Sequence, residues 1–177
     1  FVAIGVSNWR RDIDPDSGMV WVIKVDKHGA LSWDTTLSRH NLQVGYGIVE
    51  NENHYISLAQ VSKGNSSYDA LLFKLHKNGE IDWEKSYANV PSHSIIADSK
   101  DNMLISGRYA KQGISGQSDT SYLSLLLLNP SGELLWHRKM RSLERVSFVK
   151  SLAVRDTFAV LSWLGNGTRF TGPSKTN

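Results

Sequence analysis

A short phrase occurs three times in this chain, always with a glycine four residues before a tryptophan. The copies read KVDKHGALSW at 24–33, KLHKNGEIDW at 74–83 and LLNPSGELLW at 127–136. The tryptophans are therefore about 50 residues apart, a period that is typical of arrays of similar supersecondary units. Such units bury their apolar faces against one another, so the phrase limits the chain to a stacked, repetitive architecture.

A second phrase recurs between the copies of the first. IVENENHYISLA at 48–59 aligns with IADSKDNMLISG at 96–107 and more loosely with LAVRDTFAVLSW at 152–163, whereas FVAIGVS at 1–7 matches only its back half. We expect the chain to begin inside a unit. The predicted units are a partial one at 1–37, two complete ones at 45–87 and 93–140, and a partial one at 147–164.

Each unit is predicted to form four short strands. In the second unit the segments 45–50, 54–61, 69–76 and 80–87 are rich in Val, Ile, Leu, Phe and Tyr and are separated by turn residues. Gly29, Gly79 and Gly132 supply the positive backbone angle of a tight hairpin. The third segment is nearly all apolar, as in LLFKL, which indicates that both of its faces are covered. We expect an all-β chain of about thirteen strands with no long helix.

The pattern DALLFKLHKNGEIDWEKSY, followed by SIIADSKDNMLISGR, resembles the β-propeller repeats of bacterial secreted and cell-surface proteins. It is also similar to the quinoprotein-type repeat, in which a Gly and then a Trp on the outer strand form a tryptophan-docking contact with the neighbouring blade. The resemblance implies about three and a half four-stranded antiparallel blades, with Trp33, Trp83 and Trp136 lying against adjacent blades and their indole N–H groups donated to backbone carbonyls. The alternative, that these rings stack on sugars or bases, is open at this point.

Propeller rings have four to eight blades, so further blades are expected, either from the parent chain or from a second chain. The first alternative is favoured because both ends break off inside a unit. The resemblance also implies an extracytoplasmic location: periplasmic, cell-surface or secreted.

Charge and composition exclude several classes of function. The net charge of +3 comes without a run of Lys or Arg, which argues against a nucleic-acid partner. No apolar stretch approaches the roughly 18 residues of a membrane span. The absence of cysteine excludes disulfides and thiolate metal sites.

In a propeller the long connections gather on one face, and there the basic residues outnumber the acidic ones. We expect this face to bind an anionic protein or glycan partner. The candidate contact residues are Arg10, Arg11, Arg39, Arg108, Arg141 and Arg145.

One connection, DIDPDSG at 12–18, has the composition of a calcium loop. Asp12, Asp14 and Asp16 alternate and Gly18 follows them, although Pro15 intervenes and no bidentate Glu comes at the end. A calcium site and an ordinary polar turn are the two interpretations; no other cofactor is expected.

The six histidines show no metal-ligand spacing, and no nucleophile elbow or phosphate loop is present. We therefore favour a non-catalytic binding or scaffold propeller. The alternative is a fragment of a propeller enzyme, either a quinoprotein-like oxidoreductase or a glycan-active enzyme, in which a cofactor or missing blades supply the chemistry.

Overall fold

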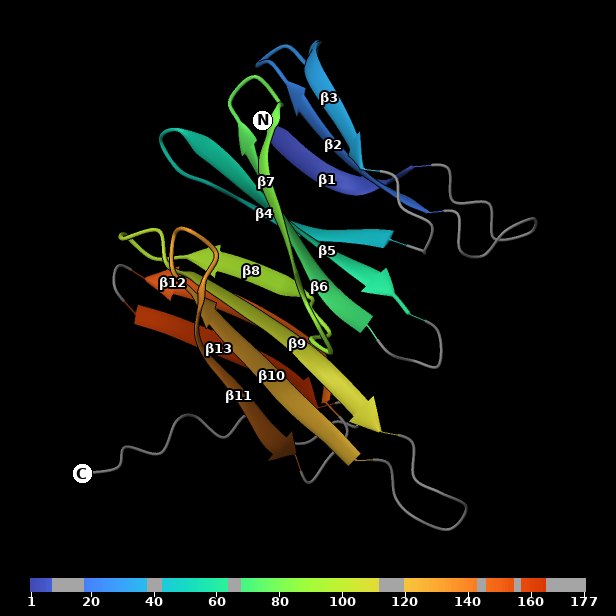
Figure 1. The fold of residues 1–177 in the computed structure, drawn as a ribbon, viewed down its shortest axis with the longest axis vertical. Coiled ribbons are helices and arrows are strands. Elements are labelled where there is room, and N and C mark those ends of the chain that lie inside the picture. The colour runs from blue at the N-terminus through green and yellow to red at the C-terminus, as the bar shows by residue number, and fades with distance from the viewer. Residues whose placement is uncertain are drawn as a thin grey trace.

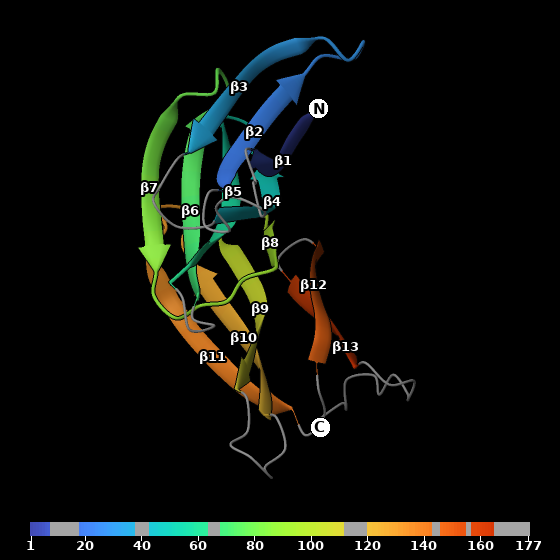
Figure 2. The ribbon, with the colours of Figure 1, turned by 90° about the vertical axis from the view of Figure 1, so that its right-hand side faces the viewer.

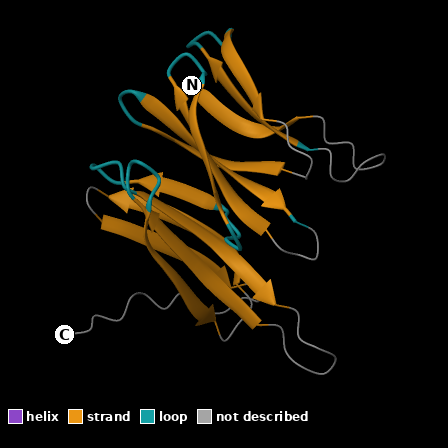
Figure 3. Cartoon of the chain, viewed as in Figure 1, coloured by secondary structure: helices purple, strands orange, loops and turns teal. Residues whose placement is uncertain are grey.

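The computed structural model of the protein consists of stacked antiparallel β-sheets (Figures 1 and 3). It describes residues 1–7, 18–37, 43–63, 68–111, 120–142, 146–154 and 157–164. These residues form thirteen strands and no helix. The prediction of an all-β chain with about thirteen strands is confirmed. No helix among the described residues is long and apolar enough to cross a membrane.

The strands are grouped into four sheets. The N-terminal sheet contains β1 (Val2–Ser7), β2 (Met19–Val25) and β3 (Leu31–Leu37). The second sheet contains β4 (Gln43–Glu50), β5 (His54–Ser62), β6 (Tyr68–His76) and β7 (Ile81–Tyr87). The third sheet contains β8 (Ser94–Ala97), β9 (Met103–Lys111), β10 (Thr120–Leu128) and β11 (Leu134–Ser142). The two-stranded sheet contains β12 (Val146–Val154) and β13 (Thr157–Leu164). Within each sheet, neighbours in sequence pair with each other.

The sheets stack in chain order, so the second sheet is buried on both faces. Along β6, Ala70 and Leu72 pack toward the third sheet, while Leu71, Phe73 and Leu75 pack toward the N-terminal sheet. Successive side chains of a strand point to opposite faces, so an apolar run fills two cores at once. For β6, the sequence-based prediction that both faces are covered is confirmed.

Figure 2 shows β3, β7 and β11 in succession along one side of the stack and β4, β8 and β12 along the other. We refer to β3, β7 and β11 as the last strands of their sheets. The tight turns at 26–30, 51–53, 77–80, 98–102 and 129–133 lie at one end of the strands, which we call the turn end (Figure 3). The opposite end, where β1, β5, β7 and β9 finish, is the loop end (Figure 1).

The turns are fixed by local side-chain hydrogen bonds and by glycine. Asp26 Oδ1 accepts the N–H groups of His28 and Ala30 at 2.8 and 2.9 Å, and Asn129 Oδ1 does the same in the third sheet. Gly29, Gly79 and Gly132 have φ values of +85°, +91° and +73°. These angles favour glycine, and they confirm the three predicted hairpin glycines.

The last strand of one sheet contacts the glycine turn of the next sheet. The indole Nε1–H of Trp33 donates to the carbonyl of Lys77 at 2.9 Å, and Thr35 Oγ1 donates to the carbonyl of Gly79 at 2.6 Å. A Cβ on Gly79 would lie 2.8 Å from atoms of the Trp33 ring, so glycine is needed there.

The following pair of sheets has an equivalent contact. Tyr87 OH donates to the carbonyl of Gly132 at 2.6 Å, and Lys85 Nζ donates to the carbonyl of Ser131. The Trp83 ring lies 3.0 Å from where a Cβ of Gly132 would be. Backbone carbonyls of the turns thus fasten the second sheet to the N-terminal sheet and the third sheet to the second.

Candidate functional site

The loop end of the second and third sheets brings Tyr46, Tyr68, His93 and Arg108 together, and we call these four residues the loop-end cluster. Tyr46 comes from β4, Tyr68 from the start of β6, His93 from the connection before β8, and Arg108 from β9. Figure 1 shows β4, β8 and β9 as neighbours in the middle of the stack.

Tyr46 is presented by a local irregularity of β4. The pairing of β4 with β5 steps between Gly45 and Gly47, so Tyr46 is the extra residue of a bulge. A Cβ on Gly45 would lie 2.5 Å from the Ile4 side chain, and one on Gly47 would lie 3.0 Å from Ile95. The two glycines therefore let β4 fit closely between its neighbouring strands, and the bulge turns the Tyr46 ring toward His93.

The connection between β7 and β8 positions His93. Asp69 Oδ1 accepts the N–H of Asn89 at 2.9 Å and so holds the beginning of this connection. A Cβ on Gly107 would lie 1.8 Å from the carbonyl oxygen of Pro91, so the connection packs directly on the β9 backbone. The N–H of His93 donates to the carbonyl of Ser106 at 2.9 Å. These two backbone contacts with β9, one at Pro91 and one at His93 itself, fix the position of the imidazole.

The rings of Tyr46 and His93 meet edge to face, with centroids 5.2 Å apart. The backbone N–H of Arg108 points at Nδ1 of His93 at 3.4 Å, a long contact that makes Nδ1 the acceptor. The proton of the neutral ring then lies on Nε2, which donates to no other described residue. Tyr46 remains 38% exposed, so the cluster is accessible from solvent.

Burial and charge keep both rings neutral at physiological pH. Burial lowers the pKa of His93 below its ordinary value of 6.5, and the positive charge of Arg108 lowers it further. Burial also raises the pKa of Tyr46, and the nearby Tyr68 adds to this effect. The cluster therefore presents neutral hydrogen-bonding aromatic groups beside one fixed positive charge.

Two polar atoms in the same part of the fold are buried without a partner among the described residues. They are Gln60 Oε1, on β5, and Ser92 Oγ, in the connection next to His93. Tyr46, Tyr68 and His93 were not predicted from the sequence. The signal that could have indicated Tyr46 is the Gly-Tyr-Gly triplet at 45–47, because glycine inside a strand is typical of a bulge or a close backbone approach.

The predicted binding residues are only partly described. Arg108 and Arg141 were expected in connections but lie on β9 and β11, because the pairing of β9 with β10 continues to Lys111 and that of β10 with β11 to Ser142. Arg108 is next to His93, whereas only the backbone of Arg141 is described. Outside the described residues lie Arg10, Arg11, Arg39 and Arg145, and also the predicted calcium ligands Asp12, Asp14 and Asp16.

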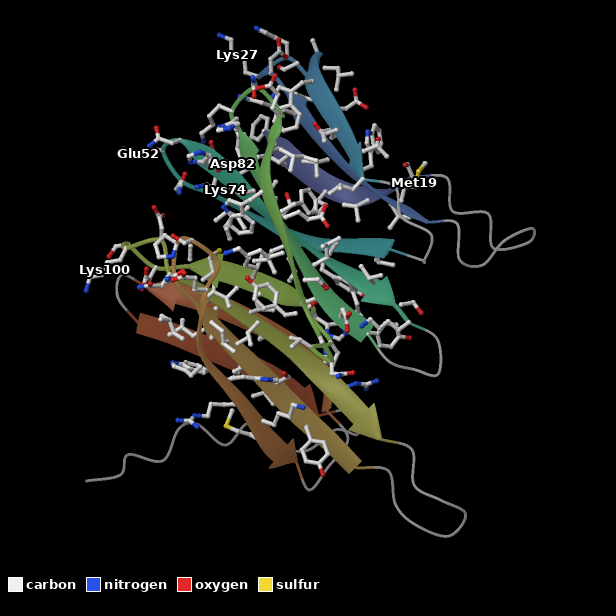
Figure 4. The ribbon with its side chains drawn as sticks, viewed as in Figure 1. Met19, Lys27, Glu52, Lys74, Asp82 and Lys100 are labelled. Atoms are coloured by element: carbon white, nitrogen blue, oxygen red, sulfur yellow. The ribbon has the colours of Figure 1, made fainter. Side chains whose placement is uncertain are left out.

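The turn end carries a different set of charged groups. Asp82 Oδ2 lies 3.5 Å from Lys74 Nζ and 3.9 Å from His54 Nε2, and the His54 and His76 rings are 5.2 Å apart. Figure 4 shows Lys74 and Asp82 near each other, with Lys27, Glu52 and Lys100 projecting from the turns. Within the described part of the chain, no three His, Asp or Glu side chains are arranged to hold a metal ion.

The sequence matches no protein-family model, and no curated protein matches it.

Proposed function

We propose that this chain is a non-catalytic binding scaffold whose loop end recognises a protein or glycan partner. The observation that carries the proposal is the loop-end cluster, in which Tyr46 of β4, His93 of the connection before β8 and Arg108 of β9 converge on an accessible surface. Tyrosine supplies a large amphipathic contact area at little conformational cost, and arginine binds carboxylate or sulfate groups with two parallel hydrogen bonds.

The stacked sheets support an assignment as consecutive blades of a β-propeller. In both four-stranded sheets the strands lie side by side in the order in which they follow along the chain. The indole rings of Trp33 and Trp83, on the last strands of their sheets, lie against the glycine turn of the next sheet. This geometry is similar to the tryptophan docking of quinoprotein-type repeats. Further blades would complete the ring, and an extracytoplasmic location follows from the resemblance to secreted and cell-surface propeller repeats.

A binding role fits the chemistry of the cluster better than catalysis does. Within the described residues, His93 accepts at Nδ1 from a backbone N–H, and the charged group that perturbs its pKa is the cation Arg108. A general base of the catalytic-triad type has a carboxylate at that position, which orients the ring and stabilises its protonated form. His93 is instead kept neutral and held in place, as a hydrogen-bond donor to a ligand requires. Calcium binding by Asp12, Asp14 and Asp16 stays a separate prediction.

The test is a binding measurement on arrays of acidic and neutral oligosaccharides and of acidic and neutral peptides. Arg108→Glu and Tyr46→Ala should weaken the binding of acidic probes at least tenfold, as expected for removing one charged or aromatic contact of about 1.4 kcal/mol or more. Lys100→Glu makes the same charge change in the same sheet at the turn end and should leave binding unchanged.

Circular dichroism establishes that each variant is folded before binding is compared. Binding that survives Arg108→Glu but is lost in Lys100→Glu would show that the recognition surface lies at the turn end, and would refute the proposal. Chemical turnover of an array probe would refute the non-catalytic assignment.

A further inference from the structure

One face of the N-terminal sheet is exposed where the equivalent faces of the next two sheets are covered. Aligning the hairpin glycines relates the β2 residues Trp21, Ile23 and Val25 to the β6 residues Leu71, Phe73 and Leu75. The three β6 residues are at most 1% exposed because the N-terminal sheet covers them. Trp21, in contrast, is 37% exposed. The β2 residues thus form an apolar surface of the kind that a neighbouring sheet covers elsewhere in this molecule.

The Gly29 turn beside this surface is also exposed, whereas the equivalent turns of the next two sheets are covered. Gly79 and Gly132 are buried, and ring atoms of Trp33 and Trp83 lie within 3.0 Å of where their Cβ atoms would be. Gly29 has the same positive φ but is exposed, and no described atom lies within 4 Å of the equivalent point. The Gly29 turn therefore has the geometry of an indole-binding turn, without an indole from the described residues.

The backbone acceptors of the three turns show the same contrast. The carbonyls of Lys77, Gly79, Ser131 and Gly132 accept side-chain hydrogen bonds from the last strand of the preceding sheet. Among the described residues, no donor is bonded to the carbonyls of Lys27, His28 or Gly29. Figure 4 shows Lys27 at the extreme end of the stack, with no further sheet beyond it.

We propose that Trp21, Ile23, Val25 and the Gly29 turn form a docking surface for a further antiparallel β-sheet that carries a tryptophan on its last strand. The incoming indole lies on Gly29 and donates its N–H to the carbonyl of Lys27, as Trp33 does at the Lys77 carbonyl. A second donor from the same strand reaches the carbonyl of Gly29, as Thr35 and Tyr87 do in the other two turns. This surface is the outer face of the first sheet in the stack and is separate from the loop-end cluster, so its occupant does not depend on what the loop end binds.

To test the proposal, a further sheet is added to the chain, and the exposure of the proposed docking surface is measured with and without it. A copy of residues 43–102 is placed directly before Phe1 of the full chain, so that the added segment contains β4–β7, β8 and the turn after β8. The junction copies a natural one, because Phe1 exchanges two hydrogen bonds with Val25 at the position where Met103 pairs with Leu128. The added strand equivalent to β8 can then pair with β1.

The reporter is a single cysteine, which is unambiguous because the chain has none. Ala3 pairs with Ile23 on the exposed face, and its counterpart in the third sheet, Ile105, is 1% exposed. Labelling of Ala3→Cys by a maleimide should be at least about tenfold slower in the extended chain, since the thiol is then reached only when the added sheet detaches. Thr36→Cys is the matched control: its counterpart Ser86 stays exposed within the stack, so its labelling should not change.

Replacing the added copy of Trp83 by alanine should restore fast labelling of Ala3→Cys in the extended chain. Equal labelling with and without a folded extension would overturn the proposal. Protection that appears in the unextended chain as its concentration rises, and that persists when Trp83 and Trp136 are replaced by alanine, would also overturn it, because the surface would then be covered without a docked indole.

Discussion

At the scale of single residues, Trp33 and Trp83 each bridge two sheets. Trp33 and Trp83 are half-buried, yet each lies on a glycine of the next sheet and on an apolar core. Trp21 is chemically identical but lies on the face that no described sheet covers. The two environments allow the same substitution to be compared inside one protein.

Trp83→Ala should lower the free energy of unfolding by about 3 kcal/mol, near the lower end for truncation of a packed aromatic residue. Trp21→Ala should cost about 1 kcal/mol or less, because an exposed ring loses fewer contacts. Urea denaturation of both variants measures the difference. Equal losses would contradict the bridging role, and lost ligand binding with unchanged stability would make Trp83 a binding residue instead.

His93 should contribute to acid sensitivity. Its pKa is lower in the folded protein than the 6.5 of an unperturbed histidine, so the unfolded chain takes up a proton more readily as the pH falls. The stability that depends on neutral His93 is therefore present above about pH 6.5 and is lost as the pH falls through the folded pKa. His93→Asn keeps an acceptor for the Arg108 N–H. Denaturant titrations between about pH 7 and about pH 5 should show a shallower decline for this variant.

If the stability of His93→Asn declines as steeply with falling pH as that of the wild type, other groups cause the acid sensitivity. His54 and His137 are the candidates, because burial lowers their pKa values too.

At the scale of elements, the turns and strands were predictable because their signals are local. A glycine four residues before a tryptophan marks a hairpin and the following strand, and an apolar run such as LLFKL indicates burial on both faces. The loop-end cluster was not predictable in this way. Tyr46 meets His93 through a bulge and a connection that are 47 residues apart, and no sequence period encodes that contact. Arg108 was predicted as a contact residue, but from a loop rather than from β9.

The connection between β7 and β8 depends on Gly107. A methyl group there would lie 1.8 Å from the Pro91 carbonyl oxygen, so Gly107→Ala must displace the connection. We expect a loss of about 1 to 3 kcal/mol, the usual range for overpacking. Gly5→Ala is the matched control, since a Cβ at Gly5 would meet nothing within 4 Å. Thermal denaturation compares the two variants, and equal melting temperatures would contradict the close approach.

Tyr87 joins the second sheet to the third through its hydroxyl group. Burial raises its pKa to about 12, and the hydroxyl donates to the Gly132 carbonyl. Tyr87→Phe should cost about 1 kcal/mol near pH 8, the net value of one hydrogen bond. Because tyrosine ionises near pH 10 when unfolded, the wild type loses part of this stability as the pH rises from about 10 to about 12. The gap between the two proteins should therefore narrow at about pH 11, and a constant gap would contradict the burial of the hydroxyl.

At the scale of the whole molecule, three sheets stack in chain order, and each is fastened to the next through the carbonyls of a glycine turn. These side-chain hydrogen bonds between sheets lie at the turn end, whereas the loop-end cluster lies at the opposite end of the strands. A rigid stack that presents aromatic and basic side chains from several strands is the arrangement on which the proposed binding function depends.

Exchange of the indole N–H protons with deuterium, followed by nuclear magnetic resonance, tests this stacking most directly. The Trp33 indole N–H, bonded to the carbonyl of Lys77 in the next sheet, should exchange only when the sheets separate. The Trp21 indole N–H, bonded to the exposed carboxylate of Asp34 within its own sheet, should exchange much faster. If the Trp33 proton exchanges as fast as that of Trp21, the sheets are not joined through the glycine turn and the proposed stack is wrong.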